Sequence, residues 1–209
     1  MAFIKTTKKY NDNLATMKSF MHVFVSSFFR IISLSFDLFS RTTKCCFLIL
    51  LLAVVTCVQA QRTLDPEFEK MLDKLLSHKA SEISVKDVSL LSDIVFIDVR
   101  EKEEYEVSHI QNAIWAGYSD FRVERISHIN PNSQVIIYCS VGYRSEKICL
   151  KLAKMGYDKS YNLFGGIFEW VNQGFSVYNE KGITTKVHAY SEKWGQWLTK
   201  GDKVFSEEG

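Results

Sequence analysis

The fold is decided by one stretch, Val135-Ile136-Ile137-Tyr138-Cys139-Ser140-Val141-Gly142-Tyr143-Arg144. Its first four residues are an apolar, largely β-branched run, which is typical of a buried parallel strand covered on both faces. The turn signal Asn130-Pro131-Asn132 comes before the run, and apolar residues at helical spacing follow over Ser145–Met155. The stretch therefore predicts a strand, a short loop that contains Cys139, and a helix.

Two more segments have the character of buried strands. Ile94–Ile97 is a second apolar run, and Tyr161–Leu163 is a shorter third one that ends before Gly165-Gly166. Apolar residues spaced by three and four over residues 66–78 predict a leading helix, with Pro66 in its first turn. Strands that alternate with helices predict an α/β fold with a central parallel sheet and helices on both faces.

Ligands of such sheets bind at the carboxyl ends of the strands. Asp98 and Cys139 both come just after a predicted strand, so we expect them at the same edge of the sheet. A thiolate at Cys139 would be favoured by the amino end of the following helix, by loop amides and by the charge of Arg144. Gly142 gives the loop backbone freedom. The alternative, an ordinary core cysteine, fits this position poorly.

The loop Cys139–Arg144, a cysteine, four residues and an arginine, resembles the active-site loop of the rhodanese family. Further ordered segments resemble this family: Asp98-Val99-Arg100-Glu101 with Tyr105, Ser108–Ala113, and Leu163–Trp170 with its Gly-Gly pair. Together the matches cover about residues 80–178. Ser108 and Asn112 stand where the family has glycines, and Asn tolerates the left-handed backbone that a turn needs there.

The resemblance implies a sulfurtransferase. Cys139 would attack a sulfane-sulfur donor, carry the sulfur as a persulfide, and release it to a thiol or to cyanide. The amides of Ser140, Val141, Gly142 and Tyr143 would cradle the anionic sulfur. Arg144 has either a catalytic role or one in holding the loop. The acceptor could also be a protein thiol, and no cofactor is implied.

Two other functions remain open at this stage. The first is a rhodanese module that binds or senses partners without catalysis, which an intact Cys139 argues against. The second is a thiol-based phosphatase or arsenate reductase. Phosphatases that resemble this fold hold five residues between cysteine and arginine, whereas this loop holds four, which suits a single sulfur atom.

Other reactive side chains are expected to be structural. Asp98 and Arg100 are interpreted as a pair that supports the loop, and His109 as a structural histidine for which nothing indicates a place beside Cys139. Cys149 lies on the apolar face of the predicted helix and should pack in the core. The histidines and cysteines show no metal-ligand spacing, so no metal site is predicted.

Residues 1–60 resemble a targeting segment. The run Cys45–Val58 is apolar apart from one threonine, follows Arg41 and Lys44, and ends at Val58-Gln59-Ala60, a small-residue cleavage pattern. The run is shorter than the roughly 18 residues expected of a spanning helix. We therefore expect an exported protein, periplasmic if the source is a Gram-negative bacterium. The alternative is an uncleaved membrane anchor, with Phe20–Phe39 as a second apolar segment.

The charged residues are unevenly distributed along the chain. The first sixty residues hold seven Lys or Arg and two Asp or Glu, whereas the rest holds nineteen basic and twenty-two acidic residues. A mildly acidic body gives no electrostatic case for nucleic-acid binding.

We expect a leading helix within residues 61–80, a rhodanese-like domain over 81–178, and an aromatic extension over 179–209. The aromatic residues of that extension are expected to pack on the domain; the alternatives are that they border the sulfur site or bind a partner.

Overall fold

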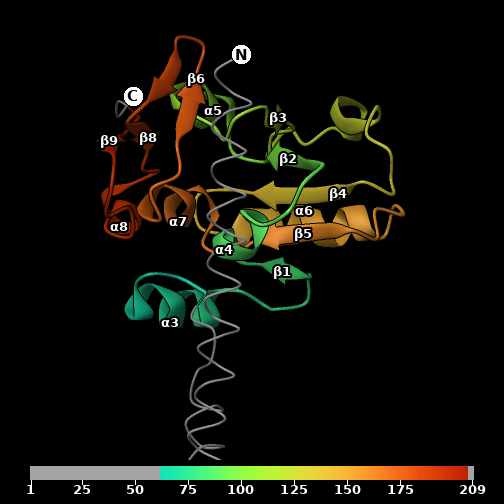
Figure 1. Cartoon of the computed structure of the whole chain (residues 1–209), viewed down its shortest axis with the longest axis horizontal. Coiled ribbons are helices and arrows are strands. Elements are labelled where there is room, and N and C mark those ends of the chain that lie inside the picture. Colours follow the sequence, from blue (N-terminus) through green and yellow to red (C-terminus); the bar gives the residue numbers. More distant parts are fainter. Residues whose placement is uncertain (1–61, 207–209) are drawn as a thin grey trace, which may run out of the picture. The chain divides into compact units, whose positions relative to one another are not determined.

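The computed structural model describes residues 62–206, and a five-stranded parallel sheet lies at its centre (Figure 1). The strands are β1 (Glu82–Ile83), β2 (Ile94–Asp98), β3 (Ile114–Trp115), β4 (Gln134–Tyr138) and β5 (Ser160–Leu163), in the spatial order β1-β5-β4-β2-β3. Every neighbouring pair is parallel. The predicted α/β fold is thereby confirmed.

Strand β4 lies at the middle of the sheet because the apolar run of the deciding stretch suits burial on both faces. Ile136 and Tyr138 belong to one buried cluster, whereas Val135, Ile137 and Cys139 belong to the other. Side chains on a strand alternate between faces, so both faces of β4 are covered. Its register with β2 places Tyr138 opposite Asp98. Strand β2 ends at Asp98, one residue later than expected, so Asp98 is the last residue of the strand rather than the first after it.

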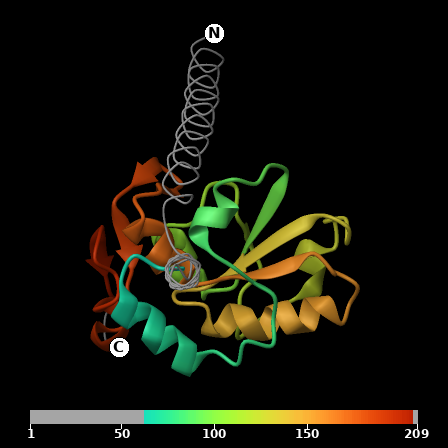
Figure 2. The same ribbon diagram turned by 60° about the horizontal axis from the view of Figure 1, so that its bottom comes forward.

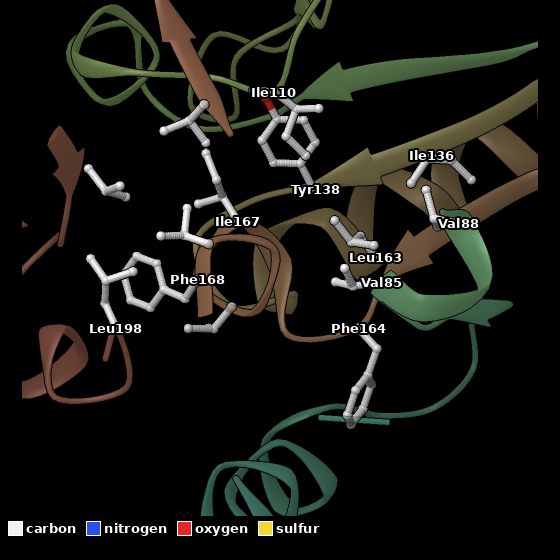
Figure 3. Packing of buried hydrophobic residues seen from close by; sticks show 14 of the residues in the cluster. Val85, Val88, Ile110, Ile136, Tyr138, Leu163, Phe164, Ile167, Phe168 and Leu198 are labelled. Atoms are coloured by element: carbon white, nitrogen blue, oxygen red, sulfur yellow. Dashed lines mark hydrogen bonds between the residues drawn. The ribbon is translucent and has the colours of Figure 1, made fainter. Parts of the chain in front are cut away.

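Helices cover the two faces of the sheet. The helices are α3 (Pro66–Leu75), α4 (Val85–Val88), α5 (Lys102–Val107), α6 (Tyr143–Ala153), α7 (Gly166–Asn172) and α8 (Glu192–Gly195), with a 3-10 turn η1 (Val123–Ile126). The first buried cluster contains apolar residues of α3, α4 and α7, and Figure 3 shows part of it around Tyr138 and Leu163. The second contains residues of α6 and η1.

The two long predicted helices are confirmed, with shifted ends. The side chain of Asp65 accepts hydrogen bonds from two amides of the first turn of α3, and the helix ends at Leu75 rather than at residue 78. Helix α6 begins at Tyr143, two residues earlier than expected, and ends at Ala153. Met155 therefore lies beyond the helix and is 44% exposed, so its predicted place on the buried face was wrong.

The C-terminal part adds two small two-stranded sheets to the described residues. Strands β6 (Val177–Asn179) and β7 (Gly182–Thr184) form a hairpin, and β8 (Lys186–His188) pairs with β9 (Asp202–Val204). Trp197 stacks on Phe68 of α3 with 5.4 Å between ring centroids, and its carbonyl accepts a hydrogen bond from Asn172 of α7. Figure 2 shows these elements beside α3 and α7, so the aromatic extension packs on the domain as expected.

The predicted targeting segment, residues 1–60, lies outside the described residues. Among residues 62–206, no helix is both long and apolar enough to cross a membrane.

Candidate active site

Cys139 directly follows β4, at the carboxyl edge of the sheet. Its side chain is 1% exposed. The amide of Gly142 donates a hydrogen bond to its Sγ over 3.2 Å, and the Ser145 hydroxyl lies 3.5 Å from the same atom. Donors directed at a sulfur atom stabilise negative charge on it more strongly than they stabilise a neutral thiol. The loop therefore directs hydrogen-bond donors at this sulfur atom.

A left-handed glycine makes this geometry possible. Gly142 has φ 111° and forms the N-cap of α6, a backbone conformation in which a side chain would be strained. Its carbonyl accepts a hydrogen bond from the side-chain amide of Asn162, at the end of β5. The turn that aims the Gly142 amide at Sγ is thus held from a neighbouring strand.

Helix α7 holds the first half of the loop. The amides of Ile167 and Phe168 donate to the carbonyls of Cys139 and Ser140 at 2.9 and 3.1 Å. Gly166 lies against the same carbonyls at φ 58°, and a Cβ there would stand 2.6 Å from the Ser140 oxygen. The Gly-Gly pair noted in the sequence therefore allows close approach of helix and loop.

Arg144 at the end of the loop is bound by a buried carboxylate. Its Nη1 and Nη2 donate to Glu104 Oε2 and Oε1 at 2.6 and 2.8 Å, and Nη2 also donates to Ser140 Oγ at 3.0 Å. Ser140 in turn donates to Glu104. This bidentate arrangement fixes both ends of the loop to α5. It gives Arg144 a positioning role, and its predicted catalytic role remains a prediction.

The pair changes the titration of both groups. Burial raises the pKa of Glu104, but hydrogen bonds and charge from Arg144 and the charge of Arg100 outweigh burial and lower it to about 2. Burial lowers the pKa of Arg144, and the hydrogen bond and charge of Glu104 together with the Cys139 sulfur outweigh burial and raise it above its ordinary value. The guanidinium therefore lies within electrostatic reach of the Cys139 sulfur.

Sequence reasoning missed Glu104. Its carboxylate also accepts a hydrogen bond from the amide of Glu101, as the third helical residue of a capping box. The spacing of Glu101 and Glu104 was a signal for the start of a helix. It did not indicate contact with Arg144, because the two residues come from different elements.

Asp98 and Arg100 form a fully buried ion pair at 2.7 Å. Arg100 Nη2 also donates to the carbonyl of Ser108 at 2.6 Å. Burial lowers the pKa of Arg100, and the charge and hydrogen bonds of Asp98, with smaller contributions from Tyr138 and Glu104, together outweigh burial and raise it. No hydrogen bond among the described residues joins this pair to the loop, so it supports the segment after α5 and, unlike Glu104, does not hold Arg144.

His109 stacks on Tyr105 with 4.0 Å between ring centroids, and its backbone pairs with Tyr178 of β6. It is not among the residues that line the site. The two departures from the family glycines are accommodated: Asn112 takes the left-handed backbone at φ 59°, and Ser108 is extended at φ −170°.

Cys149 is buried in the second cluster, where burial raises the pKa of its thiol. Its sulfur lies 3.6 Å from the Ser160 hydroxyl, and neither cysteine of the described part forms a disulfide. Residues 62–206 hold no group of three or more His, Cys, Asp or Glu side chains that could bind a metal ion.

A cavity of about 530 Å³ opens above Cys139. Loop residues line its floor, and its walls are formed by Glu101, Tyr118, Ser119, Tyr190 and Trp194. The last two come from the C-terminal extension, and the ring of Tyr190 lies 5.2 Å from the guanidinium carbon of Arg144. Extension residues therefore both pack on the domain and border the cavity above Cys139.

Fold and site together define an α/β domain whose Cys139 thiol, at the carboxyl edge of a parallel sheet, accepts a hydrogen bond from the Gly142 amide of the following loop. The family model for the rhodanese-like domain matches residues 84–173. This chain thus carries a rhodanese-like domain, as the sequence motifs predicted.

Curated relatives are named tRNA uridine(34) hydroxylase. The protein from Pectobacterium atrosepticum is 34% identical over 113 residues, 51% of this chain and 32% of that protein. The one from Salmonella agona is 27% identical over 148 residues, 65% of this chain and 39% of that protein. The chain thus spans about a third of the length of these relatives.

Similar solved structures include a rhodanese-related protein from Thermoplasma volcanium, with TM-score 0.44 and 26% identity, which covers 48% of this chain and 99% of that one. A thiosulfate sulfurtransferase from Pseudomonas aeruginosa has TM-score 0.45 and 19% identity, and covers 63% of this chain and 26% of that one.

Proposed function

We propose that this protein is a sulfurtransferase that carries sulfane sulfur as a persulfide on Cys139. The observation that carries the proposal is the hydrogen bond from the Gly142 amide to Sγ, at the floor of a cavity with room for a substrate. A buried thiol without a reaction partner would need neither the amide nor the cavity. The nearby guanidinium of Arg144 adds a positive charge to the same loop.

The reaction has two balanced steps. In the first, the Cys139 thiolate attacks the outer sulfur of a donor, a sulfur–sulfur bond forms, and the donor's own sulfur–sulfur bond breaks as the remainder leaves with the electron pair. In the second, a thiolate or cyanide attacks the outer sulfur of the persulfide and restores the Cys139 thiolate. The Gly142 amide stabilises the negative sulfur in both states.

A role on tRNA, as in the name of the curated relatives, is not favoured for this chain. The body after residue 60 carries nineteen basic and twenty-two acidic residues. Nucleic-acid binding rests on an excess of positive charge along one surface. We therefore propose small sulfane-sulfur donors and thiol or cyanide acceptors as its partners, a protein thiol among them.

The test is a mass spectrum of the reduced protein after exposure to sulfane-sulfur donors. One added sulfur atom is expected on Cys139, and cyanide should release it as thiocyanate. Cys139→Ser should abolish both signals because a hydroxyl cannot store sulfane sulfur. Cys149→Ser is the matched control, since its thiol is buried away from the cavity, and it should retain turnover.

Two results would contradict the proposal. A folded, reduced protein that never carries a persulfide with any donor would support the non-catalytic binding module. Hydrolysis of an aryl phosphate that is lost in Cys139→Ser would instead support the phosphatase.

A further inference from the structure

One wall of the sulfur cavity comes from outside the matched domain. The family model ends at residue 173, whereas Tyr190 and Trp194 line the cavity together with Cys139. In Figure 1 the arrowheads of β4 and β5 point toward the side of the molecule where β8 and α8 lie. The C-terminal extension thus lies at the edge of the sheet where the nucleophile is placed.

The extension holds Tyr190 in an unusual conformation. Its backbone has φ 66°, which is rare for a bulky side chain, and its amide donates to His188 Nδ1 at 3.1 Å. The preceding Ala189 is bound to Val204 of β9 through its amide. Strained backbone persists only where neighbouring contacts hold it, and such positions concentrate at binding sites. Here the strain places the Tyr190 ring over Arg144.

The charged groups around the cavity already have hydrogen-bond partners within the protein. The guanidinium of Arg144 is bound by Glu104. Glu101, on the wall, accepts a hydrogen bond from the Ser119 hydroxyl, and Lys147 beside the rim donates to the Tyr143 hydroxyl. None of the described lining residues thus presents an unpaired positive charge to a ligand. A small inorganic dianion would lose its hydration here without a matching charge.

The cavity surface is instead aromatic. Four of its lining residues are Tyr118, Tyr143, Tyr190 and Trp194. Tyr143 and Tyr190 are 41% and 52% exposed, and exposed aromatic groups gathered around a cavity mark a binding site more than scattered ones do. A volume of about 530 Å³ falls in the range of pockets that hold organic ligands, about 300–1,000 Å³.

We propose that Tyr190 and Trp194 make this cavity selective for sulfane sulfur attached to an aromatic or other apolar organic group. The inference rests on the proposed sulfurtransferase function and names its class of donor. With an organic thiosulfonate, the Cys139 thiolate attacks the outer sulfur, one sulfur–sulfur bond forms and another breaks, and the sulfinate leaves with the electron pair. The organic group lies against the aromatic wall, and no external oxidant or reductant is needed.

The test compares three donors by thiocyanate release with cyanide as acceptor. Benzenethiosulfonate and methanethiosulfonate carry the same charge and transfer the same sulfur, and differ only in the apolar group. Thiosulfate is the inorganic dianion. The expected kcat/KM for benzenethiosulfonate exceeds that for methanethiosulfonate by about tenfold or more, as apolar groups in a fitted pocket are discriminated. Thiosulfate should have the lowest value.

Variants of the cavity wall test whether Tyr190 and Trp194 cause the preference for the aromatic donor. Tyr190→Ala and Trp194→Ala should each lower the benzene-to-methane ratio toward one while methanethiosulfonate still forms the persulfide. Ile183→Ala removes another exposed apolar side chain of the extension, and Trp197→Ala removes its other tryptophan. Neither control residue lines the cavity, so both should keep the wild-type ratio at a temperature where all variants are folded. Because Trp194 is half-buried, the exposed Tyr190 provides a second variant should Trp194→Ala fail to fold.

The inference is overturned if the wild-type ratio is near one, if the ratio survives both wall variants, or if thiosulfate is the best donor while Cys139 still carries the persulfide. Failure of the proposed function is a different result, namely that none of the three donors places sulfur on Cys139.

Discussion

Arg144 donates through both terminal nitrogens to the carboxylate of Glu104, at 2.6 and 2.8 Å. The side chains of the two residues are only 13% and 3% exposed. Arg144 ends the loop that begins at Cys139, and Glu104 belongs to helix α5. Strands β3 and β4 separate these two elements along the chain, and the ion pair joins them in space. Several properties of the protein should depend on it.

Removal of one partner should be costly. Arg144→Met leaves Glu104 buried without its cation, which destabilises a protein by about 3–5 kcal/mol. The double variant Arg144→Met with Glu104→Leu should recover much of this loss, because no uncompensated charge remains. Urea unfolding of the two single variants and the double variant measures the coupling.

The control for that experiment is Arg122→Met. Arg122 pairs with Asp120 at 2.8 Å, but both side chains are more than half exposed. Loss of such a pair should change stability little. Equal losses of unfolding free energy in Arg122→Met and Arg144→Met would show that the buried pair stabilises the protein no more than the exposed one.

If Arg144 also supports catalysis, folded Arg144→Met should form persulfide more slowly, by up to about 10²–10³.

Stability should fall in acid because of Glu104. Its pKa is lowered to about 2 in the folded protein from an ordinary value of 4.5, so between these values the unfolded chain binds a proton that the folded protein does not. The stabilisation is complete above about pH 4.5 and is lost as the pH falls through about 2. It amounts to about 3 kcal/mol.

Chemical unfolding measured from pH 6 down to about pH 2 tests this expectation. Glu104→Gln should remove a large part of the decline, whereas Glu103→Gln, the exposed neighbour in the same helix turn, controls for loss of one negative charge. If the unfolding free energy of Glu104→Gln fell with decreasing pH as steeply as that of the wild type, Glu104 would not be the group responsible for the decline.

We expect Gly166 to be required for two reasons: its left-handed backbone conformation, and its close approach to the loop carbonyls. A Cβ in Gly166→Ala would press on the carbonyls of Cys139 and Ser140 at the point where α7 binds the loop. We expect a loss of stability beyond the roughly 1–2 kcal/mol of left-handed strain, together with slower persulfide formation. Gly156→Ala is the matched control, because Gly156 has φ 92° with nothing within 4 Å of the added Cβ.

Thermal unfolding and persulfide formation of the two variants separate strain from contact. Gly156→Ala should show only the strain and keep the wild-type rate. Two variants with the same melting temperature and the same rate would mean that α7 does not position the loop.

We also predict export with cleavage after Ala60, from the basic flank, the apolar run Cys45–Val58 and the small residues Val58 and Ala60. Amino-terminal sequencing of the protein recovered outside the cytoplasm should begin at Gln61. Ala60→Arg should block the cleavage. Full-length chain with its body on the cytoplasmic side would contradict export, and full-length chain with its body outside would support the uncleaved anchor.

The fold could be predicted because its central strands and helices each have a recognisable pattern of apolar residues in the sequence. The runs at 94–97 and 135–138 are continuous stretches of apolar residues, and the apolar spacing after Cys139 extends over several helical turns. Strands β1 and β3 have two residues each, too few for any periodicity, and both were missed. They exist because their backbones complete the ladders of β5 and β2, which is a property of the neighbouring strands.

The sequence by itself determined the nucleophile loop, since Cys139, Gly142 and the amino end of α6 are consecutive and their chemistry depends on local backbone geometry. Only the tertiary structure decided what surrounds that loop. Glu104 reaches Arg144, Gly166 reaches the Cys139 carbonyl, and Tyr190 covers Arg144 from separate elements. The physical reason is that ion pairs, close backbone approach and cavity walls depend on distance in space, which spacing along the chain does not encode.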